Sequence, residues 1–193
     1  IMTAYEKGTD YHIGMDSDSL IQAGADLEQL TWMDVRVGNY LPTPRHGKPV
    51  EVNAYWYNDL EIMKQFALLQ QDNELAQHYA ELADKVKEAF LLKFWNEEEN
   101  CLKDVLSGNS EENQVRCNQV WVLSMPYTML PKEKELCVLH KIKEELYTTA
   151  GLRTLSPRDN AFHDIYIGSM QERDRAYHQG TVWAFPLGAY YSA

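Results

Sequence analysis

The sequence contains few cysteines, and their number is odd. The three residues, Cys101, Cys117 and Cys137, show no C-x-x-C spacing, which argues against a disulfide framework or a zinc site and predicts reduced, buried thiols. The six histidines show no H-E-x-x-H or comparable ligand spacing, so no metal is expected. No apolar run approaches the roughly 18 residues of a membrane span, so no membrane partner is expected either.

Positive charge is also scarce. The chain has 18 lysine and arginine residues against 29 aspartate and glutamate residues, which gives a formal net charge of −11. A surface that follows a nucleic-acid backbone is basic, so this balance argues against nucleic acid as a partner. The same balance is compatible with a neutral substrate, although many acidic soluble proteins bind none.

Aromatic rings and isolated carboxylates gather within residues 30–58. Asp34 and Glu51 lie there with Trp32 and Trp56, and three prolines interrupt the stretch, so helix formation does not explain the mixture. The apolar face of a pyranose stacks on an indole or phenol ring, and a carboxylic acid can protonate a glycosidic oxygen. The pattern therefore indicates a sugar-cleaving pocket. A loop that is simply anchored by buried aromatics is an equally good interpretation of these residues alone.

Hydrophobic periodicity divides the chain into an irregular first part and a helical remainder. Residues 1–51 are rich in glycine and keep no apolar period, whereas apolar steps of three and four predict helices from residue 52 onward. A turn and cap at 72–74 makes the first two helices an antiparallel hairpin. We expect helices over 52–71, 75–94, 113–130 with an interruption at Pro126, and 131–150, a short strand pair within 96–108, a loop to about 180, and a further helix beginning at 181.

Length and composition favour one domain with a sizeable core, because the chain has 193 residues and is 45% hydrophobic. It begins at Ile1 and ends at Ala193, directly after an apolar run. Both ends look cut, so we expect a fragment of a longer protein.

Three sequence blocks together resemble a known family. Residues 30–58 are similar to a signature of the C-terminal amylo-α-1,6-glucosidase domain of glycogen debranching enzymes, especially those of bacteria and archaea. Residues 151–157 (GLRTLSP) and 176–183 (AYHQGTVW) match two further blocks, in the family's order. The resemblance implies an all-α (α/α)6 toroid of the six-hairpin glycosidase type. Twelve helices with loops need at least roughly 200 to 250 residues, so this chain is expected to hold about half of the barrel, with long loops at the active-site mouth.

The implied activity is hydrolysis of α-1,6-linked glucose at glycogen branch points with inversion. The implied partner is glycogen or a branched α-glucan, no cofactor is called for, and the implied location is cytoplasmic. Two alternatives stay open: another six-hairpin glycosidase of the trehalase or glucoamylase type, or a non-catalytic carbohydrate-binding or structural fragment. Half a barrel would also leave apolar helix faces exposed, which favours association into oligomers.

The resemblance assigns the general acid to Asp34, which occupies the matching position in Thr-Trp-Met-Asp. The base is less clear, because eukaryotic relatives carry a glutamate where this chain has Val182. Glu51, at the start of a predicted helix, and Glu172 are the candidates, with Asp174 as a further one. A base outside the chain is the remaining alternative, and each of these carboxylates would otherwise be a solvated or salt-bridged side chain.

Substrate-binding candidates fall into rings and hydrogen-bonding groups. Indoles can stack on glucose, although a tryptophan on a helix more often belongs to the core. Guanidinium, amide and imidazole groups can bind vicinal hydroxyls, although Arg45 could equally clamp a neighbouring carboxylate and His178 could be a satisfied buried histidine. The predicted set is Trp32, Trp56 and Trp183 for stacking, and Arg45, Asn53, Arg153, His178 and Gln179 for hydroxyl binding.

Overall fold

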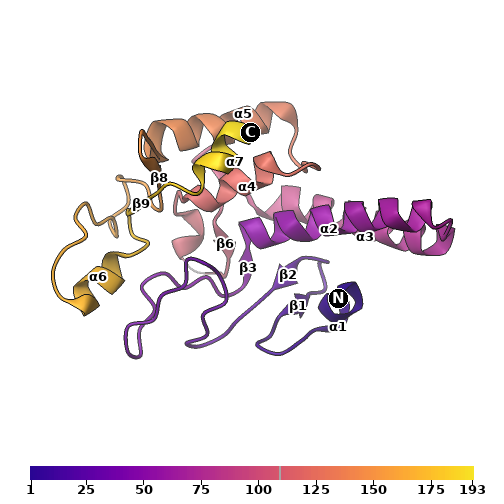
Figure 1. Ribbon diagram of the computed structural model, residues 1–193, viewed down its shortest axis with the longest axis horizontal. Helices are drawn as coiled ribbons and strands as arrows, with labels where there is room; N and C mark the ends of the chain where they lie inside the picture. Colours follow the sequence, from indigo (N-terminus) through magenta and orange to yellow (C-terminus); the bar gives the residue numbers. More distant parts are fainter. Residues whose placement is uncertain (109) are drawn as a thin grey trace.

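The computed structural model describes residues 1–108 and 110–193, and a long helical hairpin dominates it (Figure 1). Helix α2 (Val50–Leu69) and helix α3 (Asn73–Lys93) form this hairpin, as expected from the sequence. The side chain of Asp72 caps α3 by accepting a hydrogen bond from the amide of Leu75 at 3.0 Å. Local periodicity and one cap were therefore enough to predict this pair.

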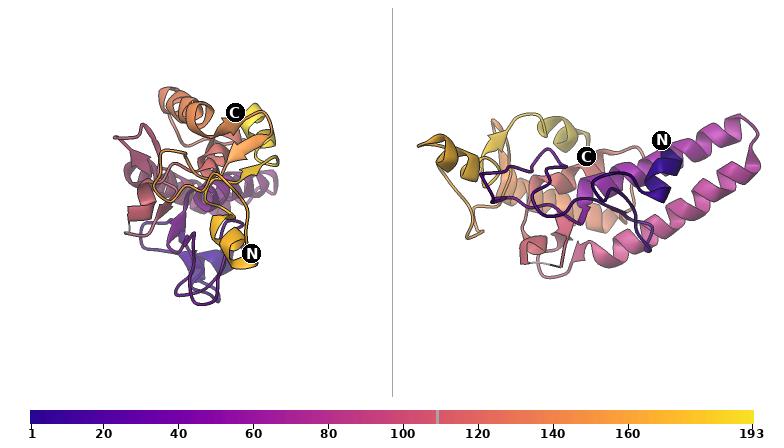
Figure 2. Two further views of the ribbon diagram at one scale, coloured as in Figure 1. Left: turned by 90° about the vertical axis from the view of Figure 1, so that its left-hand side faces the viewer. Right: turned by 90° about the horizontal axis from the view of Figure 1, so that it is seen from below.

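The base of the hairpin is buried in the body of the molecule, and its tip is not. The first half of α2 is buried on several sides, and it packs against helix α4 (Val120–Ser124), which in turn contacts helix α7 (Leu187–Ser192). Near the end of α2 the large apolar side chains are exposed, 52% for Phe66 and 79% for Leu69. Figure 2 shows the hairpin projecting from one end, with helix α6 (Met170–Ala176) at the other.

The prediction of one helix over 113–130 is wrong. Two short 3-10 turns, η1 (Ser110–Asn113) and η2 (Cys117–Gln119), precede the five-residue α4. Met125 then takes an extended conformation, with φ −76° and ψ 151°, because the residue before a proline is disfavoured in the helical region. The next helix, α5 (Lys132–Lys141), begins after Pro131 and continues as a π-helical turn, η3 (Ile142–Leu146), close to the expected fourth helix.

The expectation of an all-α chain is correct only in part, because the mostly helical chain also contains small antiparallel sheets. The toroid itself is not shown by the described residues. Helix α1 (Met2–Lys7) also lies in the part expected to be irregular. Among the described residues the paired strands are β1 (Gly14–Met15) with β2 (Ile21–Gln22), β3 (Lys48–Pro49) with β6 (Val105–Leu106), β4 (Trp95–Asn96) with β5 (Cys101–Leu102), and β7 (Tyr147–Thr148) with β8 (Gly151–Arg153) and β9 (Val182–Trp183).

Strand β7 and the turn that leads to β8 replace the last turn of the helix expected over 131–150. Strand β9 replaces the first turn of the helix expected from 181, and α7 begins only at Leu187. Gly151 opens β8 instead of ending a helix, and a side chain there would overlap the carbonyl oxygen of Trp183 on β9. Glycine therefore permits the close approach of the two strands. Because β8 and β9 belong to the blocks 151–157 and 176–183, this sheet brings two of the three family-like blocks side by side.

Two further expectations concern the cysteines and the membrane. All three cysteines are free, and Cys101 and Cys117 are buried, but Cys137 on α5 is exposed, which corrects the expectation of three buried thiols. Burial raises the pKa of the Cys101 thiol to about 12. Across the part of the chain that the structure describes, no helix combines the length and the apolar character needed to cross a bilayer.

Candidate functional site

A buried guanidinium, that of Arg116, joins three segments that are far apart in the sequence. Its Nη1 donates to the carbonyl oxygens of His178 at 2.7 Å and Thr154 at 3.3 Å, and lies 3.6 Å from the sulfur of Met33. Its Nη2 donates to Oε1 of Gln179 at 2.7 Å. The three blocks that resemble the glucosidase family therefore meet at one side chain, which the sequence did not single out.

Asp34 lies in this region with its two carboxylate oxygens in different surroundings. Oδ2 accepts hydrogen bonds from the backbone amides of Leu30 at 3.0 Å and Thr31 at 2.7 Å. Oδ1 is buried and has no hydrogen-bond partner among the described residues. The loop thus fixes the carboxylate through one oxygen and leaves the other without a hydrogen-bond partner, which a general acid requires of the oxygen that carries its proton.

Arg45 binds two carboxylates and is nearly inaccessible to solvent. Its Nη1 donates to Oε1 of Glu51, and its Nη2 donates to Oε2 of the same carboxylate at 2.6 Å. Its Nε donates to Oδ2 of Asp104 at 2.8 Å. Burial opposes its charge, but Asp104 and Glu51 raise the pKa of Arg45 above its ordinary value. The guanidinium is therefore a clamp between the start of α2 and the turn before β6, the alternative that the sequence left open.

This clamp extends to Trp32 through Asn118. The Nδ2 of Asn118 donates to Oδ1 of Asp104 at 2.8 Å, and its Oδ1 accepts the indole N–H of Trp32 at 2.8 Å. Asn118 is fully buried, and neither it nor Asp104 was among the predicted site residues. The signal that could have found Asn118 is a polar amide within an apolar run, because a buried amide must find hydrogen-bond partners.

Aromatic rings surround Trp32. Its ring meets His178 at a centroid distance of 5.0 Å and Phe185 at 4.9 Å, both in edge-to-face geometry. Trp183 lies 5.9 Å from His178 and contacts Tyr177 edge-to-face at 5.2 Å. Two of the three predicted stacking residues, Trp32 and Trp183, therefore share one aromatic cluster with His178.

The imidazole of His178 is buried and electrically neutral at neutral pH. Burial, followed by the positive charges of Arg116 and Arg45, lowers the pKa of His178 to about 4. Its Nδ1 has no partner among the described residues, and the same is true of the buried Nε1 of Trp183. Two nitrogen atoms that ordinarily hydrogen-bond are thus left in one cluster, as expected of a site that receives polar groups.

Asn53 and Trp56 lie in the core and satisfy backbone groups there. Asn53 accepts from the amide of Ile21 at 2.8 Å and donates to its carbonyl at 3.0 Å, which attaches β2 to α2. Trp56 is 3% exposed and donates its indole N–H to the carbonyl of Ser19. Neither side chain contacts the cluster around Trp32 through any hydrogen bond or ring contact between described residues.

Glu172 lies apart from the buried network. It is exposed in the first turn of α6, where it forms a capping box with Ser169. The backbone amide and hydroxyl of Ser169 lower the pKa of Glu172, and Arg175 adds to this. Asp174, the other candidate on α6, is partly buried. The structure therefore does not bring Glu172 together with Asp34.

Two hollows lie beside the three-block junction. One, of about 460 Å³, is lined by Tyr40, Pro42, Ala161, His163, Arg175 and Gln179. Arg153 lines a neighbouring one of about 340 Å³, and His163 contributes to both. The amide of Gln179 is already engaged, with Nε2 donating to the carbonyl of Pro42 at 2.8 Å. Among the described residues, no group of three or more histidine, cysteine, aspartate or glutamate side chains is placed to hold a metal ion.

Comparisons with known proteins confirm the resemblance inferred from the three blocks. Residues 1–193 match the family model described as Amylo-alpha-1,6-glucosidase. The chain is 28% identical over 130 residues to the Mannosyl-oligosaccharide glucosidase of Saccharomyces cerevisiae (strain ATCC 204508 / S288c), a match covering 63% of this chain and 14% of the yeast protein. A solved structure titled Sialidase shares the fold with a TM-score of 0.67 at 15% identity, covering 99% of this chain and 16% of that one. The chain therefore spans a small part of the length of these relatives.

Proposed function

Because the chain belongs to the amylo-alpha-1,6-glucosidase family over its full length, we propose that it is part of a glycoside hydrolase that removes α-1,6-linked glucose from glycogen branch points. The proposed substrate is glycogen or a branched α-glucan, and the proposed reaction proceeds with inversion. The proposed location is cytoplasmic, where such a substrate is stored.

The observation that carries the proposal is the asymmetric setting of Asp34. Its Oδ2 is occupied by two backbone amides, so a proton on this carboxyl group would reside on the unpartnered Oδ1. A general acid needs such an oxygen, fixed in direction and not engaged by another protein group. We assign Asp34 the protonation of the departing glycosidic oxygen.

The aromatic cluster supports the same proposal. Trp32 and Trp183 offer ring faces of the kind that stack on pyranose rings. His178, neutral because its pKa is lowered to about 4, can exchange a hydrogen bond with a sugar hydroxyl without adding charge. Such a hydroxyl would also provide a partner for the buried Nδ1 of His178.

The general base stays a prediction. An inverting glycosidase places the second carboxylate about 6.5 to 9.5 Å from the acid, so that a water molecule fits on the opposite face of the sugar. Glu51 could activate water only after its ion pair with Arg45 opens, since both of its oxygens are engaged. Glu172 would have to leave its capping box and approach the site. A base contributed from outside this chain requires neither change.

One relative supports a different linkage specificity. The yeast relative is named for a glucosidase that acts on mannosyl-oligosaccharide, and it covers more of this chain than a single block. A different glucosidase specificity on the same family of folds is therefore the second candidate. A glucosylated mannosyl-oligosaccharide, trehalose and α-1,4-linked ends are the comparison substrates that separate such a specificity from debranching.

The test is glucose release by the complete encoded protein from phosphorylase limit dextrin pretreated with a transferase. We expect activity in the wild type and a fall of about a thousandfold in Asp34→Asn, the scale for loss of a general acid. The exposed Asp10→Asn variant serves as the matched control and should keep full activity. An active Asp34→Asn enzyme would refute the acid assignment. Cleavage of only the comparison substrates, without glucose release from the limit dextrin, would refute the linkage.

The same assay examines the two predicted bases. If Glu172 is the base, Glu172→Gln lowers kcat at an unchanged melting temperature; if it only caps α6, kcat remains as in the wild type. Glu51→Gln needs both readouts, because it also weakens the buried ion pair with Arg45. A loss of kcat without a loss of thermal stability would assign the base to Glu51.

A further inference from the structure

Trp32 is held by a hydrogen bond on one edge of its indole ring. Nε1 donates to Oδ1 of Asn118 at 2.8 Å, while the ring packs edge-to-face against His178 and Phe185. Edge-to-face contacts restrict the plane of a ring, but they do not by themselves decide which edge faces which neighbour. The hydrogen bond at Nε1 determines which edge of the ring points toward Asn118, and therefore which face of the ring is directed toward the proposed glucose site.

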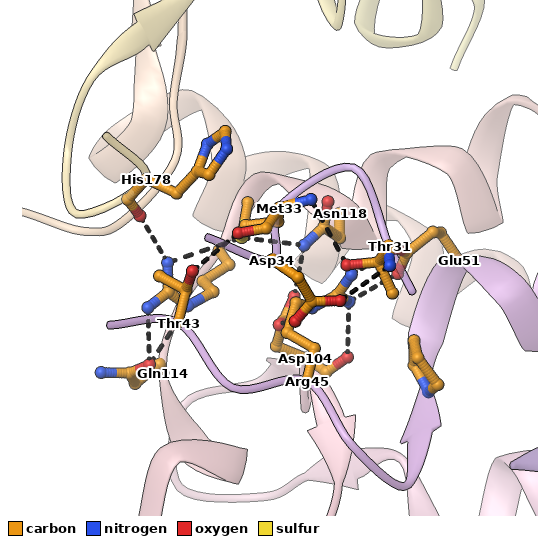
Figure 3. A network of polar contacts seen from close by, with 12 residues as sticks. Thr31, Met33, Asp34, Thr43, Arg45, Glu51, Asp104, Gln114, Asn118 and His178 are labelled. Atoms are coloured by element: carbon orange, nitrogen blue, oxygen red, sulfur yellow. Dashed lines mark hydrogen bonds and ion pairs between the residues drawn. The ribbon is translucent and has the colours of Figure 1, made fainter. Parts of the chain in front are cut away.

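Asn118 is itself oriented from behind. A side-chain amide carries a donor on one side and an acceptor on the other, so a fixed partner for one determines the direction of the other. Asp104 accepts from Nδ2 of Asn118 at 2.8 Å, and a carboxylate can only accept. The carbonyl oxygen of Asn118 must therefore point toward Trp32 (Figure 3 shows Asn118 beside Asp104).

Asp104 is in turn fixed by a charge. Its second oxygen accepts from Nε of Arg45 at 2.8 Å, and Arg45 is locked to Glu51 on the first turn of α2. Every member of this series is at least nine-tenths buried, from Glu51 through Arg45 and Asp104 to Asn118. Buried charge-assisted hydrogen bonds are short, directional and costly to break, so the series can transmit a fixed geometry from α2 to the indole.

We propose that Asn118 is a positioning residue that sets the orientation of Trp32 as a glucose-stacking platform, and that Asp104 and Arg45 hold Asn118 in place. The proposal rests on the proposed function, because it takes Trp32 as part of the glucose site. It assigns a role to two side chains, Asn118 and Asp104, that lie behind the site and do not touch the sugar.

The first test is a double-mutant cycle in the complete encoded protein, with the pretreated limit dextrin as substrate. Trp32→Phe keeps a ring but removes the N–H, and Asn118→Ala removes its acceptor. We expect each to raise KM about tenfold with kcat little changed, and the double variant to be no worse than either single one. Independent effects, which would multiply to about a hundredfold in the double variant, would overturn the proposal.

The matched control is Asn58→Ala. Asn58 is a buried asparagine on α2 that also bridges two segments, exchanging hydrogen bonds with the backbone of Tyr127 at 2.9 Å. It has no hydrogen bond to Trp32 or Asp104, so its loss should lower the melting temperature and leave KM unchanged. An equal rise of KM in Asn58→Ala and Asn118→Ala would mean that Asn118 acts only through general stability.

A swap of side chains tests the direction of the series. Asn118→Asp keeps an acceptor for the indole N–H of Trp32 but places a second carboxylate against that of Asp104. Asp104→Asn alone places two amides against each other and removes the negative charge that pairs with Arg45. The double variant Asp104→Asn with Asn118→Asp restores a donor, an acceptor and the bond to Trp32. We expect KM of this pair within about threefold of the wild type, against about tenfold for each single change. A pair no better than its single variants would contradict the proposal.

A structural readout separates this proposal from the proposed function. In a crystal structure of the complete Asn118→Ala protein, Trp32 should rotate or become disordered. An unchanged Trp32 would refute the positioning role, whatever the enzyme cleaves. If Trp32 does move but Trp32→Phe leaves KM unaltered, the tether exists and the role of Trp32 in glucose binding fails; the proposal that Asn118 orients a stacking platform then fails with it.

Discussion

Acidification should weaken the protein through His178. His178 is 3% exposed, and burial together with Arg116 and Arg45 lowers the pKa of its imidazole from an ordinary 6.5 to about 4. Between these values the unfolded chain binds a proton that the folded chain does not, so the free energy of unfolding falls as the pH falls. The loss begins near pH 6.5 and is complete below pH 4, and a shift of this size corresponds to about 3 kcal/mol.

The perturbation that isolates this effect is His178→Phe. Phenylalanine keeps an aromatic ring in contact with Trp32 but cannot titrate, and the backbone carbonyl that accepts from Arg116 is retained. The difference in free energy of unfolding between wild type and variant should shift by about 2 kcal/mol between pH 7.5 and pH 5, in favour of the variant at low pH. Urea unfolding of the complete protein at constant ionic strength measures it.

The matched control is His163→Phe, because His163 is exposed. The free energies of unfolding of the His163→Phe variant and of the wild type should fall by equal amounts as the pH falls. A difference between wild type and His178→Phe that stays constant from pH 7.5 to pH 5 would refute the reasoning. It would mean that His178 takes up its proton equally easily in the folded and unfolded states.

Two further predictions concern the junction and a strand contact. Arg116→Met should lower the free energy of unfolding by about 2 to 6 kcal/mol, because it leaves the two buried acceptors on Gln179 and His178 unpaired at about 1 to 3 kcal/mol each. A change below about 1 kcal/mol in urea unfolding would contradict this. Gly47→Ala should lower the melting temperature more than Gly38→Ala does. Both glycines have positive φ, 108° and 61°, but only at Gly47 would a side chain overlap the carbonyl oxygen of Leu106 on β6. Equal melting temperatures for the two variants would show that the overlap relaxes without cost.

Local signals predicted the helical hairpin but failed in the segment that follows. The apolar period of α2 and α3 and the cap at Asp72 act over one or two turns, so the sequence alone contains them. Residues 113–130 are apolar too, which predicted a helix. The chain there is instead extended at Arg116, with φ −122° and ψ 160°, because its side chain binds segments elsewhere in the sequence. Apolar content does not distinguish a helix from such a buried connection.

The candidate site was predicted by residue type more successfully than by role. Trp32, Trp183 and His178 do share a cluster, and Asp34 lies beside the same junction. Asn53 is chemically as suitable for binding a hydroxyl, yet the structure uses it to attach β2 to α2. An amide or an indole has the same hydrogen-bonding capacity in a core and in a binding site. Only its neighbours decide which of the two it serves.

The sequence by itself determined the acidic balance, the hairpin and the family. These depend on composition, on a period of a few residues and on three blocks in order, all of which are local properties of the chain. Only the tertiary structure decided that Arg45 is a clamp, that Arg116 joins the blocks and that Asn118 tethers Trp32. The partners in these contacts are separated by 59 residues for Arg45 with Asp104 and by 86 for Trp32 with Asn118. A hydrogen bond forms between whichever groups the fold brings within about 3 Å, and no local pattern specifies that choice.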